Sequence, residues 1–154
     1  MIGLRKMEEK DLEFIEQVYR STRESELRMT NWPEEERRRF IIMQSMAQLA
    51  EYKTKFKDAS YQVILYKKKP AGRLFLHESD TEIRIIDIAI LPSFQRKGIG
   101  SSLLRNIIAS AKQKNKMVSL HVLPDNPAKK LYDKLGFKTI RKNNLHDYME
   151  WRME

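Results

Sequence analysis

A switch from strand to helix periodicity between residues 82 and 113 constrains the fold of this chain more than any other feature. Residues 82–91 are rich in isoleucine and predict a buried strand that stops at Pro92. After a short loop with two glycines, apolar residues recur at helical spacing over 97–113. The apolar face predicted for this helix consists of Ile99, Leu103, Leu104, Ile107, Ile108 and Ala111. A buried strand that leads directly into an amphipathic helix is typical of a sheet covered by helices.

Strands and helices alternate closely along the rest of the chain. Further strands are predicted over 4–7, 61–66, 73–77, 117–122, 137–141 and 146–153, and further helices from Asp11, from Asn31-Trp32-Pro33-Glu34 and over 127–134. The order β-α-α-β-β-β-α-β-α-β-β predicts a mixed α/β sheet. No linker, repeat or low-complexity tract interrupts it, so a single domain is expected over 1–154.

Four local predictions concern how these elements begin, turn and pack. Asp11 is expected to cap the first helix. The segment 67–72, Lys-Lys-Lys-Pro-Ala-Gly, is expected to form a turn, and Asn143-Asn144 a second turn in the closing antiparallel pair. The periodic apolar residues of the second helix are Phe40, Ile41, Met43, Met46, Leu49 and Ala50.

Composition excludes several kinds of protein. The chain contains no cysteine, which excludes disulfides, thiolate metal sites and cysteine nucleophiles. Its three histidines, His77, His121 and His146, show none of the usual zinc spacings, so no metal site is expected. No apolar run reaches the ~20 residues that a membrane span needs, and the N-terminus has no signal-peptide core. We therefore expect a cytoplasmic protein with no membrane partner.

The positive charge is concentrated in the second half of the chain. The net charge is +9, and residues 1–80 carry 16 Lys and Arg against 14 Asp and Glu, whereas residues 81–154 carry 14 against 7. Such a half attracts polyanions, which include nucleic acid, acidic lipid and phosphorylated cofactors. Charge alone does not choose among these three.

The loop after the isoleucine-rich strand has the chemistry of a phosphate site. It reads Gln95-Arg96-Lys97-Gly98-Ile99-Gly100 and opens the helix that follows. Glycines leave backbone N–H groups uncovered, and the helix N-terminus and two cations add positive charge. The loop matches neither the P-loop, which ends in Gly-Lys-Ser/Thr, nor the dinucleotide fingerprint, whose third glycine would stand at Leu103.

A second segment follows the strand at 117–122. It reads Asn-Pro-Ala-Lys-Lys-Leu-Tyr-Asp-Lys-Leu-Gly-Phe over 126–137. Together and in this order, the two segments resemble the Gcn5-related N-acetyltransferase (GNAT) superfamily, whose acyl-CoA loop has the pattern Gln/Arg-x-x-Gly-x-Gly/Ala. The specific resemblance covers residues 82–140, and the first 80 residues match only in layout.

The resemblance implies a fold and a cofactor site. The fold is a mixed, mostly antiparallel central sheet flanked by helices, with one splayed parallel strand pair. Acetyl-CoA would be the co-substrate, without a metal: its pantetheine arm would pair with the backbone of Ile88, Ala89 and Ile90, and Asn126 would orient it. The pyrophosphate would lie on the N–H groups of residues 96 to 101, and Lys129 and Lys130 are candidates for the 3′-phosphate. The cofactor-binding residues expected on this basis are Ile88, Ala89, Ile90, Gln95, Arg96, Lys97, Gly98, Ile99, Gly100, Ser101, Asn126 and Lys129.

The resemblance also implies catalytic roles. The backbone N–H of Ile90 would polarise the thioester oxygen, and Tyr132 matches the family's usual general acid for the leaving thiolate. The two positions at which relatives carry a glutamate base hold Arg84 and His121 here. His121 and Asp87 are therefore the candidate bases, and the alternatives are a hydrogen-bonded structural histidine and a structural pair of Asp87 with Arg84 or Arg73.

The predicted function is transfer of an acetyl group from acetyl-CoA to a primary amine by direct attack in a ternary complex. The acceptor would be a small molecule or a peptide that meets the helix pair at 11–52 and the closing hairpin. Members of this family often form homodimers through their late strands, so pairing is a further expectation. Two alternatives stay open, a non-catalytic acyl-CoA-binding protein and a basic nucleic-acid-binding module. The second lacks the interleaved aromatics and the helix-turn-helix or zinc patterns of known nucleic-acid binders.

Overall fold

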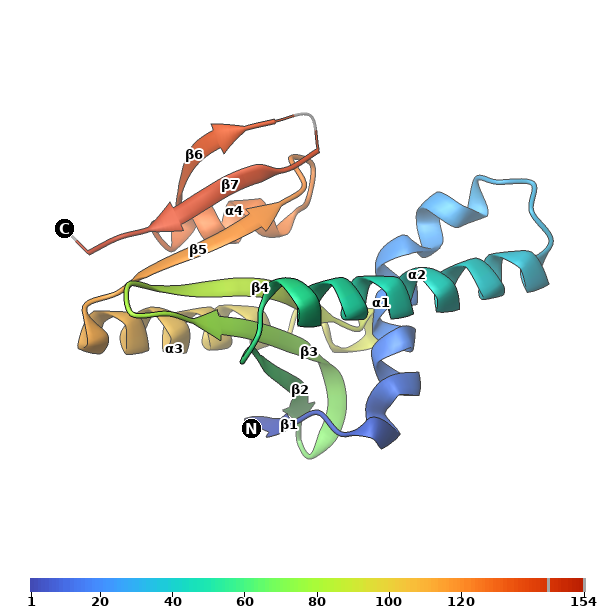
Figure 1. The fold of residues 1–154 in the computed structure, drawn as a ribbon, viewed down its shortest axis with the longest axis horizontal. Helices are drawn as coiled ribbons and strands as arrows, with labels where there is room; N and C mark the ends of the chain where they lie inside the picture. Colours follow the sequence, from blue (N-terminus) through green and yellow to red (C-terminus); the bar gives the residue numbers. More distant parts are fainter. Residues whose placement is uncertain (144, 154) are drawn as a thin grey trace. The chain divides into compact units, whose positions relative to one another are not determined.

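The computed structural model describes residues 1–143 and 145–153, which form seven strands and four α-helices (Figure 1). The strands are β1 (Ile2–Lys6), β2 (Ser60–Tyr66), β3 (Lys69–Glu78), β4 (Glu82–Ile90), β5 (Met117–Val122), β6 (Lys138–Lys142) and β7 (Asp147–Trp151). The α-helices are α1 (Leu12–Arg28), α2 (Glu34–Lys55), α3 (Ile99–Lys114) and α4 (Ala128–Lys134), and short 3-10 turns stand at Glu9–Asp11 and Pro92–Phe94. The predicted order of strands and helices is confirmed.

The seven strands join one sheet in the order β1-β2-β3-β4-β5-β7-β6. β1 pairs antiparallel with β2, and β7 pairs antiparallel with both β5 and β6. β4 and β5 form the parallel pair, because α3 carries the chain from the end of one strand back to the start of the other. The sheet is therefore mixed and mostly antiparallel, as predicted.

The chain packs as two compact units, each with its own interior. The first comprises Met1–Phe75 and Asp87–Lys97, and the second comprises Leu76–Ile86 and Gly98–Glu154. In the first unit α1 and α2 pack against each other through Tyr19, Leu27 and Ile41. Its other buried side chains include Ile15, Val18, Val63, Ile64, Leu74 and Phe75.

In the second unit α3 packs on β5 and buries the apolar face that its sequence predicts. All six predicted residues of that face are buried, and the other buried residues of this unit include Ile83, Ile85, Val118, Leu120, Met149 and Trp151. A helix keeps such a face against a sheet because burying each large aliphatic side chain contributes roughly 2 kcal/mol.

The hairpin between β2 and β3 is tighter than predicted. The turn consists of Lys67 and Lys68, both in the left-handed region with φ of 50° and 69°, and β3 starts at Lys69. Two left-handed residues give the backbone the twist that a two-residue hairpin needs. The expected turn over 67–72 is therefore wrong in extent, since Pro70, Ala71 and Gly72 belong to the strand.

Asp11 does not cap α1 as predicted. It is the residue before the helix, but its side chain makes no capping hydrogen bond. Both carboxylate oxygens instead accept hydrogen bonds from Arg5, at 2.8 Å each, and one also accepts from the backbone N–H of Glu8. The hydrogen bond from Arg5 lowers the pKa of Asp11 to about 2. The residue therefore ties β1 to the start of α1.

The packing face of α2 also differs from the predicted one. Met43 and Met46 are 63% and 68% exposed, whereas Ser45 is buried. Ile41 is buried as predicted, but farther along the helix the residues that contact β3 and β4 are the polar Gln48 and Tyr52. A helix that buries polar groups against a partner network does not show its packing face as an apolar stripe.

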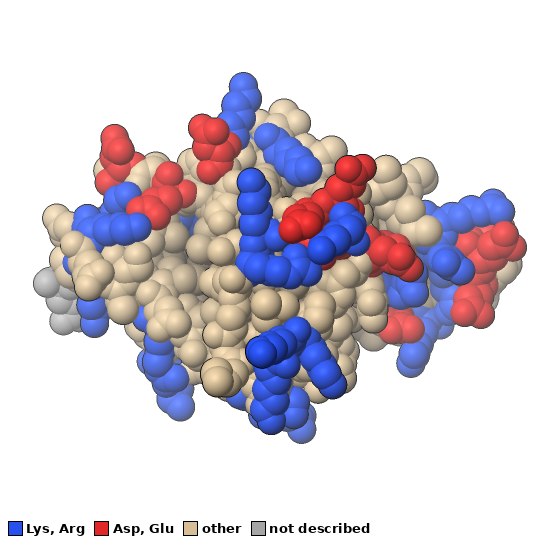
Figure 2. Space-filling view, turned by 90° about the horizontal axis from the view of Figure 1, so that it is seen from below, with Lys and Arg blue, Asp and Glu red and all other residues tan. Residues whose placement is uncertain are grey.

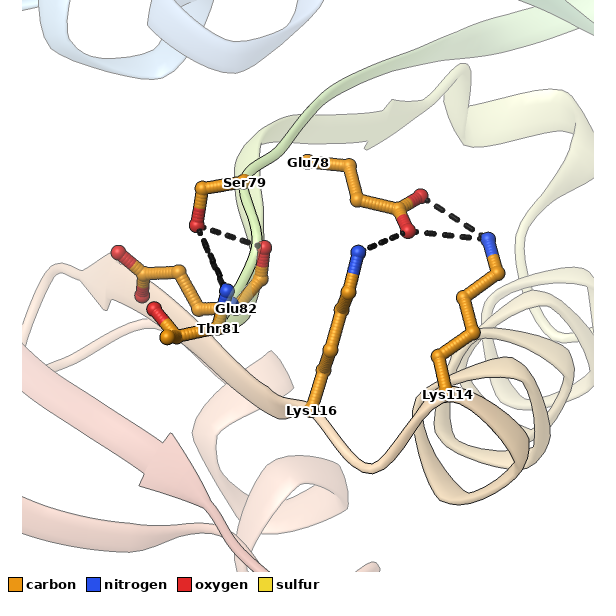
Figure 3. A network of polar contacts seen from close by, with 6 residues as sticks. All are labelled: Glu78, Ser79, Thr81, Glu82, Lys114 and Lys116. Carbon is orange, nitrogen blue, oxygen red and sulfur yellow. Dashed lines mark hydrogen bonds and ion pairs between the residues drawn. The ribbon is translucent and has the colours of Figure 1, made fainter.

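A polar network fixes the start of β4 in the second unit (Figure 3). Glu78 accepts hydrogen bonds from Lys116 at 2.7 Å and from Lys114 at 3.0 Å, and these lower its pKa. In the same turn the backbone N–H of Glu82 donates to the hydroxyl of Ser79 at 3.2 Å. The end of β3 is thereby held to the connection between α3 and β5.

Within the described ranges, no helix is long and apolar enough to cross a membrane. On the face drawn in Figure 2, Lys and Arg side chains are spread out, with Asp and Glu beside several of them, and do not form one continuous track.

At the turn predicted over Asn143-Asn144, the side-chain oxygen of Asn143 accepts hydrogen bonds from the backbone N–H groups of Leu145 and His146. Asn144 lies outside the described residues.

Candidate functional site

The first half of the glycine-containing loop belongs to the first unit and is tied back to β4. The side-chain amide of Gln95 donates a hydrogen bond to the carbonyl of Ile90, the last residue of β4, at 2.9 Å. Arg96 follows with a φ of 63° in the left-handed region. The Pro92–Phe94 turn lies between Ile90 and Gln95, so the Gln95 bond closes this part of the loop onto the end of the strand.

The end of β4 lies against β3 on one edge. Gly72 approaches so closely that a Cβ there would stand 2.2 Å from the carbonyl oxygen of Ala89, so only glycine fits. The N–H of Leu91 donates to the carbonyl of Ala71 at 2.9 Å. The parallel ladder with β5 covers only Glu82–Ile85 of β4, and the strand continues for five residues beyond it.

The second half of the loop opens α3 in the second unit. Gly98 stands at the N-cap with a φ of 77°, and nothing lies within 4 Å of a Cβ built on it, so its backbone conformation rather than crowding requires glycine. The first hydrogen bond of the helix runs from the N–H of Ser102 to the carbonyl of Gly98 at 3.0 Å. The N–H groups of Ile99, Gly100 and Ser101 precede it and have no intrahelical partner. No acidic residue stands in this first turn.

Sequence reasoning missed a cationic contribution from the β2–β3 hairpin. Within the first unit, the ammonium groups of Lys67 and Lys97 lie 5.5 Å and 5.8 Å from the ring centre of Tyr66. Phe94 packs edge-on against the same ring at 6.2 Å. The hairpin therefore adds positive charge next to the loop, and the Lys67-Lys68-Lys69 run was its signal in the sequence.

Asn126 and Lys129 stand at the start of α4 in the second unit. The side-chain oxygen of the exposed Asn126 accepts a hydrogen bond from the N–H of Ala128 at 2.9 Å. Lys129 forms an ion pair with Asp147, whose side chain is only 2% exposed. The charge of Lys129 is therefore paired with a buried carboxylate, whereas Lys130 is exposed.

Tyr132 lies on α4 and is 5% exposed. Its ring contacts Phe137 at 5.6 Å between ring centres, and its carbonyl accepts the N–H of Phe137 at 3.0 Å. The segment after α4 therefore folds back over the tyrosine and fixes where its ring lies.

Asp87 forms an ion pair with Arg73, which is the structural alternative to a role as catalytic base. Its carboxylate accepts hydrogen bonds from Arg73 at 2.8 Å and from the hydroxyl of Tyr52 at 3.1 Å. The Arg73 side chain is 3% exposed, and the same terminal nitrogen donates to Gln48 at 2.8 Å. Burial, and then the charge of Asp87, raise the pKa of Tyr52.

His121 lies on β5 and is exposed. Its Nδ1 stands 3.5 Å from a guanidinium nitrogen of Arg84, and its ring contacts Tyr148 at 5.1 Å between ring centres. A neutral imidazole with this exposure can exchange a proton with a substrate or with water.

The predicted site residues thus fall into two groups. The first unit holds Asp87, Ile88, Ala89, Ile90, Gln95, Arg96 and Lys97, and the second holds Gly98, Ile99, Gly100, Ser101, His121, Asn126, Lys129 and Tyr132. Among residues 1–143 and 145–153, no cluster of three His, Asp or Glu side chains could hold a metal ion.

The family assignment rests on comparison with known proteins. The model of the Acetyltransferase (GNAT) family matches residues 15–137, so this chain belongs to that family. The fold agrees with it. The structure of PaiA N-acetyltransferase from Thermoplasma acidophilum, solved in complex with coenzyme A, superimposes with a TM-score of 0.71 at 20% identity over 99% of both chains.

Two curated relatives match shorter stretches. The [ribosomal protein bS18]-alanine N-acetyltransferase of Haemophilus influenzae is 42% identical over 65 residues, which are 40% of this chain and 44% of that protein. The uncharacterized N-acetyltransferase CgeE of Bacillus subtilis is 33% identical over 103 residues, which are 58% of this chain and 40% of that protein. The chain therefore spans less than half the length of the curated relatives it matches.

Proposed function

We propose that this protein transfers the acetyl group of acetyl-CoA to a primary amine, by direct attack of the amine in a ternary complex. The observation that carries the proposal is the loop from Gln95 to Ser101, which is braced against β4 by a hydrogen bond and opens α3 with three N–H groups that lack intrahelical partners. The family match and the coenzyme A complex of the structural neighbour support it.

In this proposal each part of acetyl-CoA meets a different kind of group. The pantetheine arm pairs with the backbone of Ile88–Ile90, the part of β4 that extends beyond its ladder with β5. The amide nitrogen of Asn126 donates to a pantetheine carbonyl, because its oxygen is already held by Ala128. The pyrophosphate lies on the N–H groups of residues 96–101, and Arg96, Lys97 and Lys67 supply charge for the phosphates.

The reaction forms one bond and breaks another. The amine nitrogen attacks the thioester carbon, the C–S bond breaks, and the amine loses a proton while the thiolate gains one. The N–H of Ile90 stabilises the charge that develops on the thioester oxygen, and Tyr132 donates the proton to the thiolate. No covalent intermediate with the protein is needed, in keeping with a chain that has no cysteine.

The base that accepts the amine proton is either His121 or Asp87. We favour His121, because it is exposed, whereas Asp87 already accepts two hydrogen bonds and balances the buried Arg73. If His121 is the base, H121Q removes the acidic limb of the pH–rate profile and lowers kcat/KM about 100-fold. If that limb persists in H121Q and disappears in D87N, the role belongs to Asp87.

The test of the proposed function is a calorimetric titration with acetyl-CoA and, in parallel, with acetyl-dephospho-CoA. Micromolar binding of acetyl-CoA, followed by thiol release with a panel of primary amines, would confirm the proposal. Weaker binding without the 3′-phosphate would assign part of the basic surface to that group. Binding without thiol release for any amine would indicate a non-catalytic acyl-CoA-binding protein. Absence of binding would refute the cofactor site, and binding to RNA or DNA with a steep salt dependence would then support the nucleic-acid alternative.

A further inference from the structure

We propose that the acceptor carries a carboxylate close to its amine, and that Arg84 and Arg141 bind this carboxylate on the polar face of β4, β5, β7 and β6. The inference rests on the proposed function, because it names the class of acceptor that would be acetylated next to His121.

The strand register places the relevant side chains on one face of the second unit. Arg84 lies opposite Ser119, and Ser119 lies opposite Glu150. One step along, His121 lies opposite Tyr148, and Tyr148 lies opposite Arg141. Residues directly opposite each other on neighbouring strands point to the same face of a sheet.

Arg141 reaches this face because of an irregularity in β6. Thr139 pairs with Met149 and Arg141 pairs with the next residue back, Tyr148, so that Ile140 is an extra residue in the strand. Such a β-bulge re-aims the side chains that follow it. Without the bulge, Arg141 would point to the same face as Thr139, which is the face of the buried Met149.

Both guanidinium groups lie against the ring of Tyr148, at 5.5 Å for Arg84 and 4.5 Å for Arg141. The Nε of Arg84 donates to the hydroxyl of Ser119 at 2.7 Å, which fixes the plane of its guanidinium. Within the described ranges, neither guanidinium forms an ion pair. Two arginines held on one aromatic ring thus retain charge and N–H donors for a ligand.

The two carboxylates of this face have other partners. Glu82 accepts a hydrogen bond from Ser119 at 2.6 Å. Glu150 accepts hydrogen bonds from the hydroxyl of Tyr148 at 2.7 Å and from Arg152 at 2.9 Å. Burial alone would raise the pKa of Glu150, but these two hydrogen bonds and the nearby charges of Arg152 and Arg141 outweigh it and lower the pKa. Both carboxylates therefore accept hydrogen bonds from other groups, and within the described residues neither forms an ion pair with Arg84 or Arg141.

The chemistry of the face selects anionic acceptors. Guanidinium groups bind carboxylates through paired N–H donors, and such charged hydrogen bonds are stronger than neutral ones. Arg84 also lies beside His121, so a carboxylate bound here keeps an amine a few bonds away close to the proposed base. Polyamines, which carry only positive charge, are repelled by the same two arginines.

The experiment compares matched acceptors in which a carboxamide replaces one carboxylate, and kcat/KM is expressed per unprotonated amine because loss of an α-carboxylate also lowers the pKa of the amine. Alanine is compared with alaninamide, which tests an α-carboxylate, and Ala-Asp-amide with Ala-Asn-amide, which tests a side-chain carboxylate on a peptide. We expect kcat/KM to be at least about tenfold higher for the carboxylate member of one pair. R141Q should abolish that preference, and R141K should retain part of it. K142Q is the matched control, because Lys142 is the adjacent cation on the opposite face of β6, and it should leave the preference intact.

A second measurement does not depend on turnover. N-acetylalanine and N-acetylalaninamide are titrated into the protein saturated with CoA, and likewise the two acetylated peptides. Tighter binding of a carboxylate product, lost in R141Q and in R84Q while acetyl-CoA affinity is unchanged, would confirm the inference. Equal binding of the members of both pairs would overturn it. Thiol release that favours spermidine would also overturn it, although the proposed acetyltransferase activity would then stand.

Discussion

The side-chain amide of Gln95 donates a hydrogen bond to the carbonyl of Ile90 at 2.9 Å and so joins the loop to the end of β4. In the proposed site, the N–H of Ile90 faces the thioester and the N–H groups after Gln95 face the pyrophosphate. The hydrogen bond would therefore fix the position of the pyrophosphate end of the cofactor site relative to its thioester end. Because the bond is exposed, it contributes little to the overall stability of the fold.

Substitution of Gln95 by leucine tests this role. We expect Gln95→Leu to weaken acetyl-CoA binding by about 1 kcal/mol, roughly five- to tenfold, because a single neutral hydrogen bond is lost. Calorimetric titration measures the change, and urea unfolding should show a stability within about 0.5 kcal/mol of the parent. Gln113→Leu, an exposed change at the far end of α3, is the control and should leave the affinity unchanged. An unaltered affinity in Gln95→Leu would show that the loop does not depend on this bond.

Asp87→Asn should destabilise the first unit strongly. The substitution leaves the buried guanidinium of Arg73 without its counter-charge, and breaking a buried pair in this way costs about 3 kcal/mol. Urea denaturation followed by circular dichroism measures the loss. Asp80→Asn, on an exposed turn, should cost less than about 0.5 kcal/mol. The double variant Arg73→Met/Asp87→Leu should recover most of the loss, since it removes both charges. If Asp87→Asn is as stable as the parent, the pair is not the structural element described above.

The sequence predicted some parts of this molecule well because their signals are local. The face of α3 was predicted residue by residue, since burial against a sheet repeats every three to four residues. The loop between β4 and α3 was also predictable, because glycine, proline and a change of period mark it in the sequence.

Other parts depend on contacts between distant residues. Met43 and Met46 were counted among the periodic apolar residues of α2, but both are exposed, and Gln48 and Tyr52 of this helix bind Arg73 and Asp87. Asp11 was predicted to cap a helix, but its carboxylate instead accepts hydrogen bonds from Arg5, six residues earlier on β1. The bulge at Ile140 has no sequence signal of its own, because β7 determines the pairing. In each case the residue that determines the local structure lies on another helix or strand.

The Arg5–Asp11 pair makes stability depend on pH in the acid range. The pKa of Asp11 is lowered to about 2 in the folded chain, whereas an unfolded aspartate titrates near pH 3.9. Between these values the unfolded state binds one more proton at this site than the folded state, so the stability that the pair contributes is present above about pH 4 and is lost toward pH 2.

Asp11→Asn should therefore reduce stability at pH 7 and flatten the acid branch of the stability curve. Urea midpoints measured at pH 7, 4, 3 and 2.5 give the slope for parent and variant. The gap between the two proteins should narrow as pH falls below 4, because the parent loses the contribution that the variant lacks. Asp125→Asn, at an exposed position, should leave the shape of the curve unchanged. A gap that stays constant down to pH 2.5 would contradict the assigned pKa.

Tyr132→Phe separates the proposed general acid from its packing role. The ring lies against Phe137 and is buried, and phenylalanine keeps that packing while it removes only the hydroxyl. If the hydroxyl protonates the leaving thiolate, kcat should fall by about 100-fold or more, whereas the affinity for acetyl-CoA should change less than about threefold. Single-turnover thiol release measures the first quantity and calorimetry the second. Tyr66→Phe, which removes a hydroxyl from the β2 ring beside Lys97, is the matched control and should retain the parent's kcat. Full activity in Tyr132→Phe would mean that the thiolate leaves without the help of this residue, because CoA thiolate is already a good leaving group near neutral pH.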